Sequence, residues 1–168
     1  LNSILDPECA VPASTRFCAA LVLLFGARPQ QISRLRVSDI AVSGSDVYLR
    51  LGTDPVLLPE VLVELAIATC ENRRAPRMFA PTIDNEWLFP GSKSGYPLWA
   101  AAINHRLRRV GVSASKGRTG AMASLAQDLP PTILARLTGT SPSTAIRWSV
   151  AVAACNARYA AFAIQQVP

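Results

Sequence analysis

The sequence is poor in the residue types that build metal sites and hydrolytic triads. Its one histidine is His105, and only Lys93 and Lys116 among its 17 lysines and arginines are lysines. One histidine leaves little room for a Ser-His-Asp triad. The cysteines never form a C-x-x-C pair, so neither a zinc site nor a disulfide framework is expected, and a reducing cytoplasm fits best. They are Cys9, Cys18, Cys70 and Cys155.

Long hydrophobic runs are also missing. The longest, at 17–27, is FCAALVLLFGA, with eleven residues. A membrane-spanning helix needs about 20, so this run predicts a buried helix and no membrane partner is expected. No basic leader precedes a signal-like hydrophobic region, and therefore no export signal is predicted.

Core-forming residues and arginine are abundant. The chain of 168 residues is 50% hydrophobic and 17% charged, with a mean hydropathy of +0.25, which predicts one folded domain over 1–168. A net charge of +6 and a pI near 9.7 favour an acidic partner such as nucleic acid. Fifteen of the 17 cations are arginines, whose planar fork suits phosphate, although a GC-rich genome would produce the same bias.

The order of elements predicts a mainly α domain with a small antiparallel β-meander. The first helix is expected to be capped by Ser14 or Thr15 and to end at Gly26, and a second is expected to start at Pro29. The meander is expected over 38–59, with turns at Ser43-Gly44 and at 52–55. Further helices are predicted over 59–72, 98–110, 117–128, 131–138 and 142–165.

Several motifs within this order resemble the catalytic domain of the tyrosine recombinase (phage integrase) family, over residues 13 to 150. The most specific is Gly26-Ala27-Arg28 followed by Leu35-Arg36 and Ser38-Asp39-Ile40, which looks like the first-arginine motif of the family. Supporting motifs are WLFP at 87–90, Arg118-Thr119 and the glycine of LTGT at 137–140. The resemblance implies double-stranded DNA as partner and DNA recombination or integration as process. It also implies that an N-terminal DNA-binding domain is missing from this chain.

The family attacks a phosphodiester with a tyrosine hydroxyl and uses neither a metal nor another cofactor. Fixed cations must then stabilise the phosphorane. By resemblance these are Arg28 and Arg118. An arginine between a helix-ending Gly26 and a helix-starting Pro29 is held rigidly enough for that role. The alternative for Arg28 is a contact with the carbonyls at the helix end or a salt bridge.

The remaining active-site positions depart from the family. Ser115, beside Lys116, stands where a histidine or lysine is usual, and Thr140 stands where a histidine or tryptophan is usual. About nine residues beyond Thr140, where the family has its nucleophilic tyrosine, this sequence has a serine. The meander turn lacks the lysine that would protonate the leaving oxygen. The resemblance therefore implies a pseudoenzyme that binds DNA without cutting it. The other substitutes are Gln31 for the usual acid, Arg50 as the cation nearest the turn, and Ser149 next to Trp148.

Tyr159 is the remaining candidate nucleophile, since it is the only tyrosine after residue 96. Its spacing is about ten residues longer than the family has, and core or interface packing is the alternative. Additional DNA contacts are expected from further basic residues, each of which could instead belong to a solvated face. These residues are Arg36, Arg106, Arg108, Arg109, Lys116 and Arg147.

Two other functions remain open. Residues 130–152 have the spacing of a helix-turn-helix, with Ala135 and Ile146 packing the two helices and Thr144 and Arg147 facing a groove, which would make the protein a DNA-binding regulator. The alanine-rich tail at 142–168 has an apolar stripe, which would suit a protein-interaction module that binds a second copy of the chain or another recombinase through the C-terminal helix.

Overall fold

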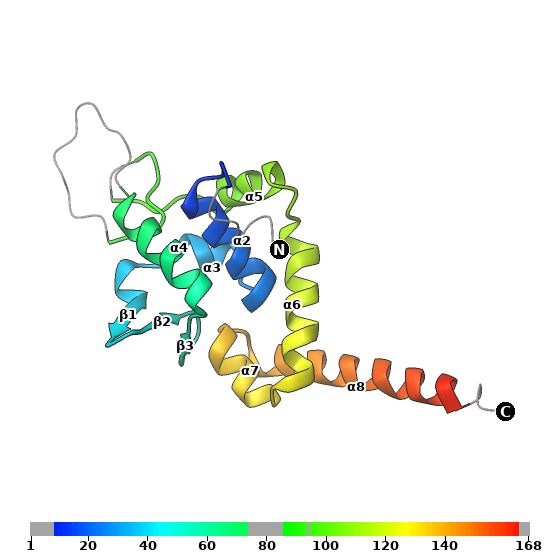
Figure 1. Ribbon diagram of the computed structural model, residues 1–168. Coiled ribbons are helices and arrows are strands. Elements are labelled where there is room, and N and C mark those ends of the chain that lie inside the picture. The colour runs from blue at the N-terminus through cyan, green and yellow to red at the C-terminus, as the bar shows by residue number, and fades with distance from the viewer. Residues whose placement is uncertain (1–8, 74–85, 94, 165–168) are drawn as a thin grey trace.

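The computed structural model describes residues 9–73, 86–93 and 95–164, with side chains described to residue 157. Helices precede and follow one three-stranded sheet, in the order that the sequence predicts (Figure 1). The elements in chain order are α2 (Ala13–Phe25), α3 (Pro29–Ser33), the 3-10 turn η1 (Val37–Asp39), β1 (Ile40–Ser43), β2 (Asp46–Arg50), β3 (Pro55–Leu57), α4 (Glu60–Glu71), α5 (Ala100–Arg109), α6 (Ala114–Asp128), α7 (Pro131–Thr138) and α8 (Pro142–Ile164).

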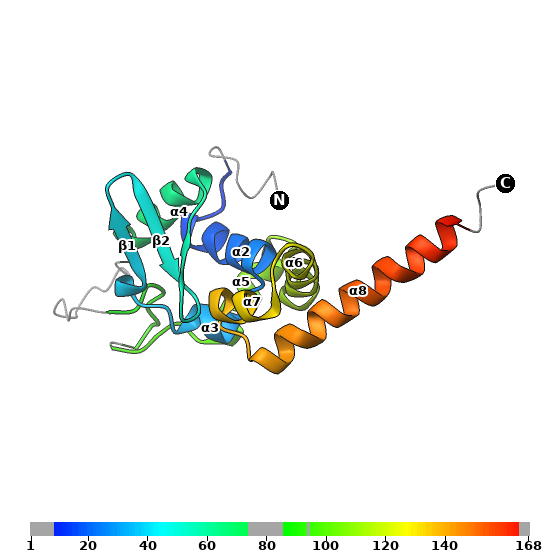
Figure 2. The same ribbon diagram turned by 90° about the horizontal axis from the view of Figure 1, so that it is seen from below.

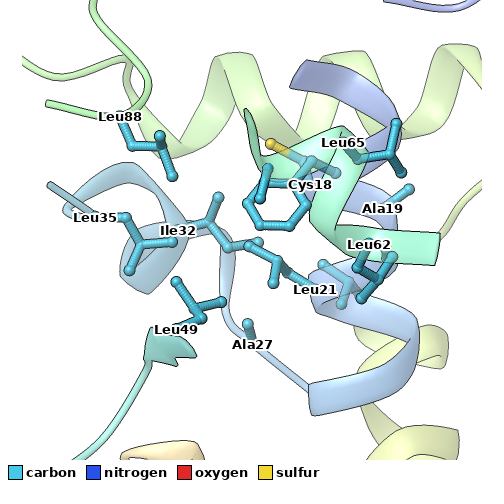
Figure 3. Close-up of a cluster of buried hydrophobic side chains, with 14 of the residues drawn as sticks. Cys18, Ala19, Leu21, Ala27, Ile32, Leu35, Leu49, Leu62, Leu65 and Leu88 are labelled. Carbon is cyan, nitrogen blue, oxygen red and sulfur yellow. The ribbon is translucent and has the colours of Figure 1, made fainter. Parts of the chain in front are cut away.

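Helix α2 is the centre of the domain, because from Phe17 onward it is apolar on every side. Residues 15–22 are all buried, and α4, α5 and α6 pack around the helix. Leu21 of α2, Ile32 of α3 and Leu49 of β2 meet in one cluster of fully buried side chains (Figure 3). The eleven-residue apolar run is therefore a buried helix, as the sequence predicts.

The sheet is an antiparallel meander in the order β1-β2-β3. Val47 and Leu49 of β2 face the core, whereas the strand neighbours between and beside them are more exposed, which is the alternation expected of a sheet with one covered face. Gly44 occupies the first turn with a φ of +62°, a conformation that favours glycine. The sheet thus covers one side of the hydrophobic cluster around α2, which is called the α2 cluster below.

A second, smaller hydrophobic cluster joins α6, α7 and the start of α8. Its five buried residues are Met122, Ala126, Leu134, Ala135 and Ala145. Beyond this cluster α8 leads away from the rest of the molecule in both views (Figures 1 and 2). The side chains of residues 153–157 are all exposed. Residues 153–157 of α8 therefore have no packing partner within the described part of the chain.

The structure corrects three expectations about helix ends and packing. Pro12, not Ser14 or Thr15, is the N-cap of α2, and Thr15 is buried. Helix α6 begins three residues before the expected position because the Ser113 hydroxyl accepts a hydrogen bond from Lys116 N at 3.4 Å and caps it. Ile146 does not pack α7 against α8, since it is 52% exposed and Ala145 fills that place.

No helix in the described residues combines the length and the apolar character that a membrane crossing requires.

Candidate functional site: an arginine-lined cavity

Arg28 lies at the junction of two helices, and its backbone is fixed from both sides. Gly26 ends α2 in a left-handed conformation with a φ of +62°, and Pro29 is the first residue of α3. Arg28 itself is the extended N-cap residue, and its N–H donates to Gln31 Oε1 at 3.4 Å. Its side chain is exposed. The fixed backbone leaves an exposed guanidinium at a defined place.

Arg118 comes from the second turn of α6 and is held against the end of α2. Its guanidinium Nη1 donates to the carbonyl oxygen of Gly26. Glycines permit this approach, since a Cβ on Gly117 would lie 2.9 Å from Leu23 and one on Gly26 would lie 2.9 Å from Met122. Burial lowers the pKa of Arg118, and the nearby positive charge of Arg28 lowers it further. The two arginines are thus close enough to repel each other.

Both arginines line one cavity of about 450 Å³. The α2–α3 junction, the β2–β3 turn, α6 and the end of α7 all contribute to its wall. Within the described part of the chain no carboxylate forms an ion pair with Arg28 or Arg118. Asp39 is the one acidic residue among the described lining residues, and its Oδ2 accepts from Arg36 N at 2.8 Å. The lining residues are Arg28, Gln30, Gln31, Arg34, Leu35, Asp39, Arg50, Leu51, Gly52, Arg118, Thr138, Gly139 and Thr140.

The wall formed by the β2–β3 turn is fastened to the end of α7. The Gln31 amide donates to Leu51 O at 2.7 Å and to Thr138 O at 2.9 Å, so it joins both segments to α3. Backbone N–H of Thr53 donates to Arg136 O at 2.8 Å. A Cβ on Gly52 would lie 2.0 Å from the same carbonyl oxygen. Gln31, which replaces the acid of the family, therefore serves as a double donor that an ionised carboxylate could not be.

Arg136 and Asp54 add an ion pair across the same seam. The guanidinium contacts both carboxylate oxygens, with Nη2–Oδ1 and Nε–Oδ2 distances of 2.9 Å. The turn in which the resemblance implies a lysine is thus held by backbone and side-chain contacts, and Arg50 is the cation that it contributes to the cavity.

The other substituted positions lie in different surroundings. Thr140 lines the cavity, whereas Ser115 and Lys116 are exposed in the first turn of α6. The Ser149 hydroxyl donates to Ala145 O at 3.3 Å in its own helix, and Trp148 packs against the smaller cluster. Tyr159 belongs to the backbone of α8, but its side chain lies outside the described residues.

The additional basic residues do not converge on the cavity. Arg36 pairs with Glu86 at 3.1 Å and lies 5.2 Å from the centre of the Trp87 ring. Arg106 and Arg109 line a separate cavity beside the start of α2, and Arg108 lines a third at the α5–α6 junction. Ile103 and Leu107 of α5 are buried and form the apolar side of that helix.

Arg147 lies on the exposed surface of α8. In the same turn of the helix, Thr144 is half-buried and accepts a hydrogen bond from the Ser141 hydroxyl at 2.8 Å. The predicted groove-facing pair of a helix-turn-helix is therefore one exposed arginine and one threonine engaged in capping its own helix.

The cavity wall also contains two arginines, Arg34 and Arg50, that the sequence does not single out as site residues. Arg34 follows α3 and shares a side with Gln30 and Gln31, since residues three and four apart are neighbours on a helix. The spacing of Arg34 from Gln30 and Gln31, within the first-arginine motif, is the sequence signal that could have placed it at the site. Arg50 is expected from the sequence only as the cation nearest the meander turn, and the structure places it in the cavity wall.

No protein-family model matches the chain, and no curated protein matches it in sequence. Solved structures do match its fold. XerA recombinase superposes with a TM-score of 0.61 at 18% identity, covering 86% of this chain and 56% of that protein. XerH site-specific recombinase, bound to its palindromic difH substrate, gives 0.64 at 14% identity, covering 95% of this chain and 50% of that protein.

The integrase of transposon Tn1549, in complex with transposon right end DNA, gives a TM-score of 0.60 at 13% identity, covering 95% of this chain and 63% of that protein. The chain thus spans 50% to 63% of the length of these three solved proteins. Its helices, its three-stranded sheet and their order agree with the fold that the sequence motifs predict. The chain therefore has the fold of a tyrosine recombinase catalytic domain.

Proposed function

We propose that this domain binds the sugar-phosphate backbone of double-stranded DNA through the arginine-lined cavity, in a DNA recombination or integration system. The observation that carries the proposal is the convergence of Arg28 and Arg118 on one cavity without a carboxylate partner among the described residues. Two neighbouring guanidiniums that have no carboxylate partner among the described residues and repel each other are stabilised by an anion placed between them. Arg34 and Arg50 add further positive charge to the same wall.

The fold supports DNA as the source of that anion. The XerH and Tn1549 structures of the same fold were solved with DNA bound. A net charge of +6 favours association with a polyanion. Free, widely spaced cysteines fit a cytoplasmic location for such a protein.

We further propose that the domain binds DNA without cutting it. Among the described side chains, no tyrosine, histidine or lysine lines the cavity. Ser149 donates to its own helix, and Arg50 holds its proton too tightly to serve as a general acid. Arg28 and Arg118 would then hold an intact phosphodiester.

The binding proposal is tested by fluorescence anisotropy of a labelled mixed-sequence duplex across a salt series. Arg28→Ala should weaken binding and reduce the slope of log affinity against log salt by about one, because one phosphate contact is lost. Arg118→Lys keeps the charge but loses the planar fork, so it should weaken binding while leaving most of the salt slope. Lys93→Ala, which removes one charge outside the cavity, is the matched control. Equal affinity of all three variants and the natural protein would refute the proposal.

The cleavage proposal is tested with a nicked duplex that traps covalent intermediates. No covalent protein–DNA adduct should be detected on a denaturing gel. An adduct that disappears in Tyr159→Phe would show that Tyr159 is a working nucleophile and would overturn this part of the proposal. Arg28→Ala serves as the control, since an adduct that persists in this variant does not depend on the cavity.

A second role, self-association through α8, is favoured by a separate observation. The last described side chains of α8 are exposed, and Ile146 and Val150 on the same helix are 52% and 62% exposed. We propose that this helix binds a second copy of the chain or another recombinase. Binding of DNA bases by α7 and α8 as a helix-turn-helix has less support, because Thr144 is engaged in capping. If DNA binding in the anisotropy assay depends on Arg147 and not on the cavity arginines, the helix-turn-helix regulator is favoured.

A further inference from the structure

We infer that a second cavity, at the start of α2, binds a small molecule that carries a phosphate monoester. This cavity, here called the α2–α5 cavity, has a volume of about 450 Å³ and lies between the first turn of α2 and the last turn of α5, two helices that pack together (Figure 1). None of its described lining residues belongs to the arginine-lined cavity, which lies at the other end of α2. A ligand of the α2–α5 cavity is therefore separate from the DNA phosphates of the proposed function. The polar lining residues are Ser14, Thr15, Arg106 and Arg109.

Two guanidiniums supply the positive charge of the α2–α5 cavity. Arg106 and Arg109 are three residues apart in α5, so their side chains are neighbours on the helix surface. Within the described part of the chain neither forms an ion pair with a carboxylate, and no acidic residue lines the cavity. A phosphate monoester carries a charge of about −1.5 to −2 at pH 7. It therefore compensates both arginines, whereas a phosphodiester, with a single charge, would leave one of them uncompensated.

The first turn of α2 adds backbone donors to the same cavity. Its N-cap is Pro12, which offers no side-chain acceptor, and no acidic residue follows in the turn. The N–H groups of Thr15 and Arg16 donate to Pro12 O at 2.9 and 3.1 Å. Those of Ala13 and Ser14 have no acceptor among the described residues. The positive end of the helix dipole thus lies at the cavity without an anion beside it, an arrangement that favours phosphate.

Thr15 points to a ligand independently of the helix end. It is 7% exposed and lines the cavity, and its hydroxyl has no hydrogen-bond partner among the described residues. Two other buried threonines, Thr69 and Thr138, donate to the carbonyl oxygen four residues earlier in their helices, at 2.6 and 2.7 Å. Thr15 lacks such a helical acceptor, because the residue four places before it, Val11, precedes α2. A buried hydroxyl without a partner is costly, so an acceptor bound in the cavity would stabilise it.

The size and the apolar lining of the cavity favour an organic phosphate over a lone ion. Its volume falls within the range of about 300–1,000 Å³ that small-molecule sites occupy. Val11 and Val110 contribute apolar side chains to the wall. The phosphate would accept from the hydroxyl, backbone and guanidinium donors, and the organic group would contact the valines.

The inference is tested by calorimetric titration of the full chain with methyl phosphate and with dimethyl phosphate, at neutral pH and constant ionic strength. The Arg28→Ala variant is the background for these titrations, because methyl phosphate could also enter the arginine-lined cavity. We expect saturable binding of methyl phosphate. Dimethyl phosphate, which has the single charge of a DNA phosphate, should bind about tenfold more weakly or less, because one charged contact is not compensated.

In the same background, Arg109→Gln should weaken the binding of methyl phosphate by about tenfold, because one charged donor is lost. Arg108→Gln is the matched control, since Arg108 is the neighbouring exposed arginine of α5 and does not line this cavity. Thr15→Val, which keeps the shape and removes the hydroxyl, should weaken binding by about fivefold. Without ligand, Thr15→Val should melt at the same or a higher temperature than its background, because it removes an unsatisfied polar group.

Three results would overturn the inference. The first is a lack of saturable methyl phosphate binding, and the second is an equal effect of Arg108→Gln and Arg109→Gln on that binding. The third is a lower melting temperature of Thr15→Val without ligand, since the hydroxyl would then stabilise the free fold.

A DNA phosphate is the competing source of the anion. Equal affinity for dimethyl phosphate and methyl phosphate would favour DNA and overturn the inference. In the duplex assay, Arg109→Gln should bind no more weakly than Arg108→Gln, and a selective loss in Arg109→Gln would likewise assign the cavity to DNA. If Arg28→Ala leaves duplex binding unchanged but methyl phosphate still binds through Arg109, the proposed function fails and the α2–α5 cavity remains a phosphate site.

Discussion

Cys18 illustrates how a single buried residue couples stability to pH. Its side chain is fully buried in the α2 cluster, and burial raises the pKa of the thiol from its ordinary 9.0 to about 12, although the charge of Arg106 opposes the shift. The folded protein therefore keeps the Cys18 proton over a pH range in which the unfolded chain loses it. Cys155, in contrast, is exposed on α8.

The free energy of unfolding should fall as pH rises above 9.0, because the folded state then binds more protons than the unfolded state. The loss attributable to Cys18 should approach about 1.4 kcal/mol per pH unit and end near pH 12. Urea unfolding just below pH 9.0 and one unit above it measures this loss. In Cys18→Ala this contribution should vanish, and an identical pH dependence in both proteins would contradict the assignment.

The sequence predicts some site residues much better than others. Arg28 was predictable because a glycine helix end and a proline helix start flank it, and both features are local. The buried hydroxyl of Thr140, which has no hydrogen-bond partner among the described residues, was not, since it depends on where α7 ends and on what the neighbouring chain segments leave unbonded. The phosphate-holding roles of Arg28 and Arg118 remain predictions, although both residues line one cavity.

At the scale of elements, the seam between the β2–β3 turn and α7 fixes one wall of the cavity. The seam needs a residue without a side chain at Gly52, because a carbonyl oxygen lies where a Cβ would be. Sequence patterns predicted the turn and the helix but not their contact. The Gln31 amide that joins them spans 107 residues to reach Thr138. Such long-range pairs leave no periodic signal in a single sequence.

Gly52→Ala should therefore destabilise the domain by about 2 kcal/mol or more, because the new methyl group would collide with backbone that is anchored by Arg136 and Asp54. Gly120→Ala is the matched control. It lies in α6 with nothing within 4 Å of its Cβ position, so it should stabilise the domain by about 0.5 kcal/mol or more. Chemical unfolding measures both. If Gly52→Ala leaves the free energy of unfolding unchanged, the β2–β3 turn and α7 can move apart without cost, and this prediction is wrong.

Helix boundaries were less predictable than helix positions. The expected and observed spans of α7 coincide, because Pro131 and Gly139 mark both of its ends. The expected start of α6 at residue 117 is wrong, because Ser113 caps the helix by accepting a hydrogen bond from Lys116 N and the helix begins at Ala114. The assignment of Arg118 to the second turn of α6 followed from that correction.

At the scale of the whole molecule, the most unusual feature is α8, whose 23 residues span about 35 Å. Beyond Val152, its described side chains, those of residues 153–157, are exposed and lie outside the two hydrophobic clusters, and the helix leads away from the rest of the molecule (Figure 2). An extended helix that carries exposed apolar side chains is stabilised when a partner covers them.

Self-association should therefore persist at high salt and without DNA, since burial of apolar surface is not screened by ions. Sedimentation analysis over a range of concentrations measures it. Ile146→Lys should abolish the association, and Ile67→Lys on α4 is the matched control, because the two isoleucines are 52% and 44% exposed. A monomer at all concentrations, or equal effects of the two variants, would refute the role of α8.

The presence of two separate hydrophobic clusters has a consequence for the cooperativity of unfolding. Arg28 is attached to the larger cluster, whereas Gly139 and Thr140 follow a helix of the smaller one. The smaller cluster has only five buried residues, so we expect it to have the lower local stability and to exchange its amide hydrogens through openings that leave the larger cluster folded. A phosphate that contacts both sides would make that opening release the ligand. Bound DNA should therefore convert two partly independent folding units into one, with amide protection in α7 rising to the level of α2.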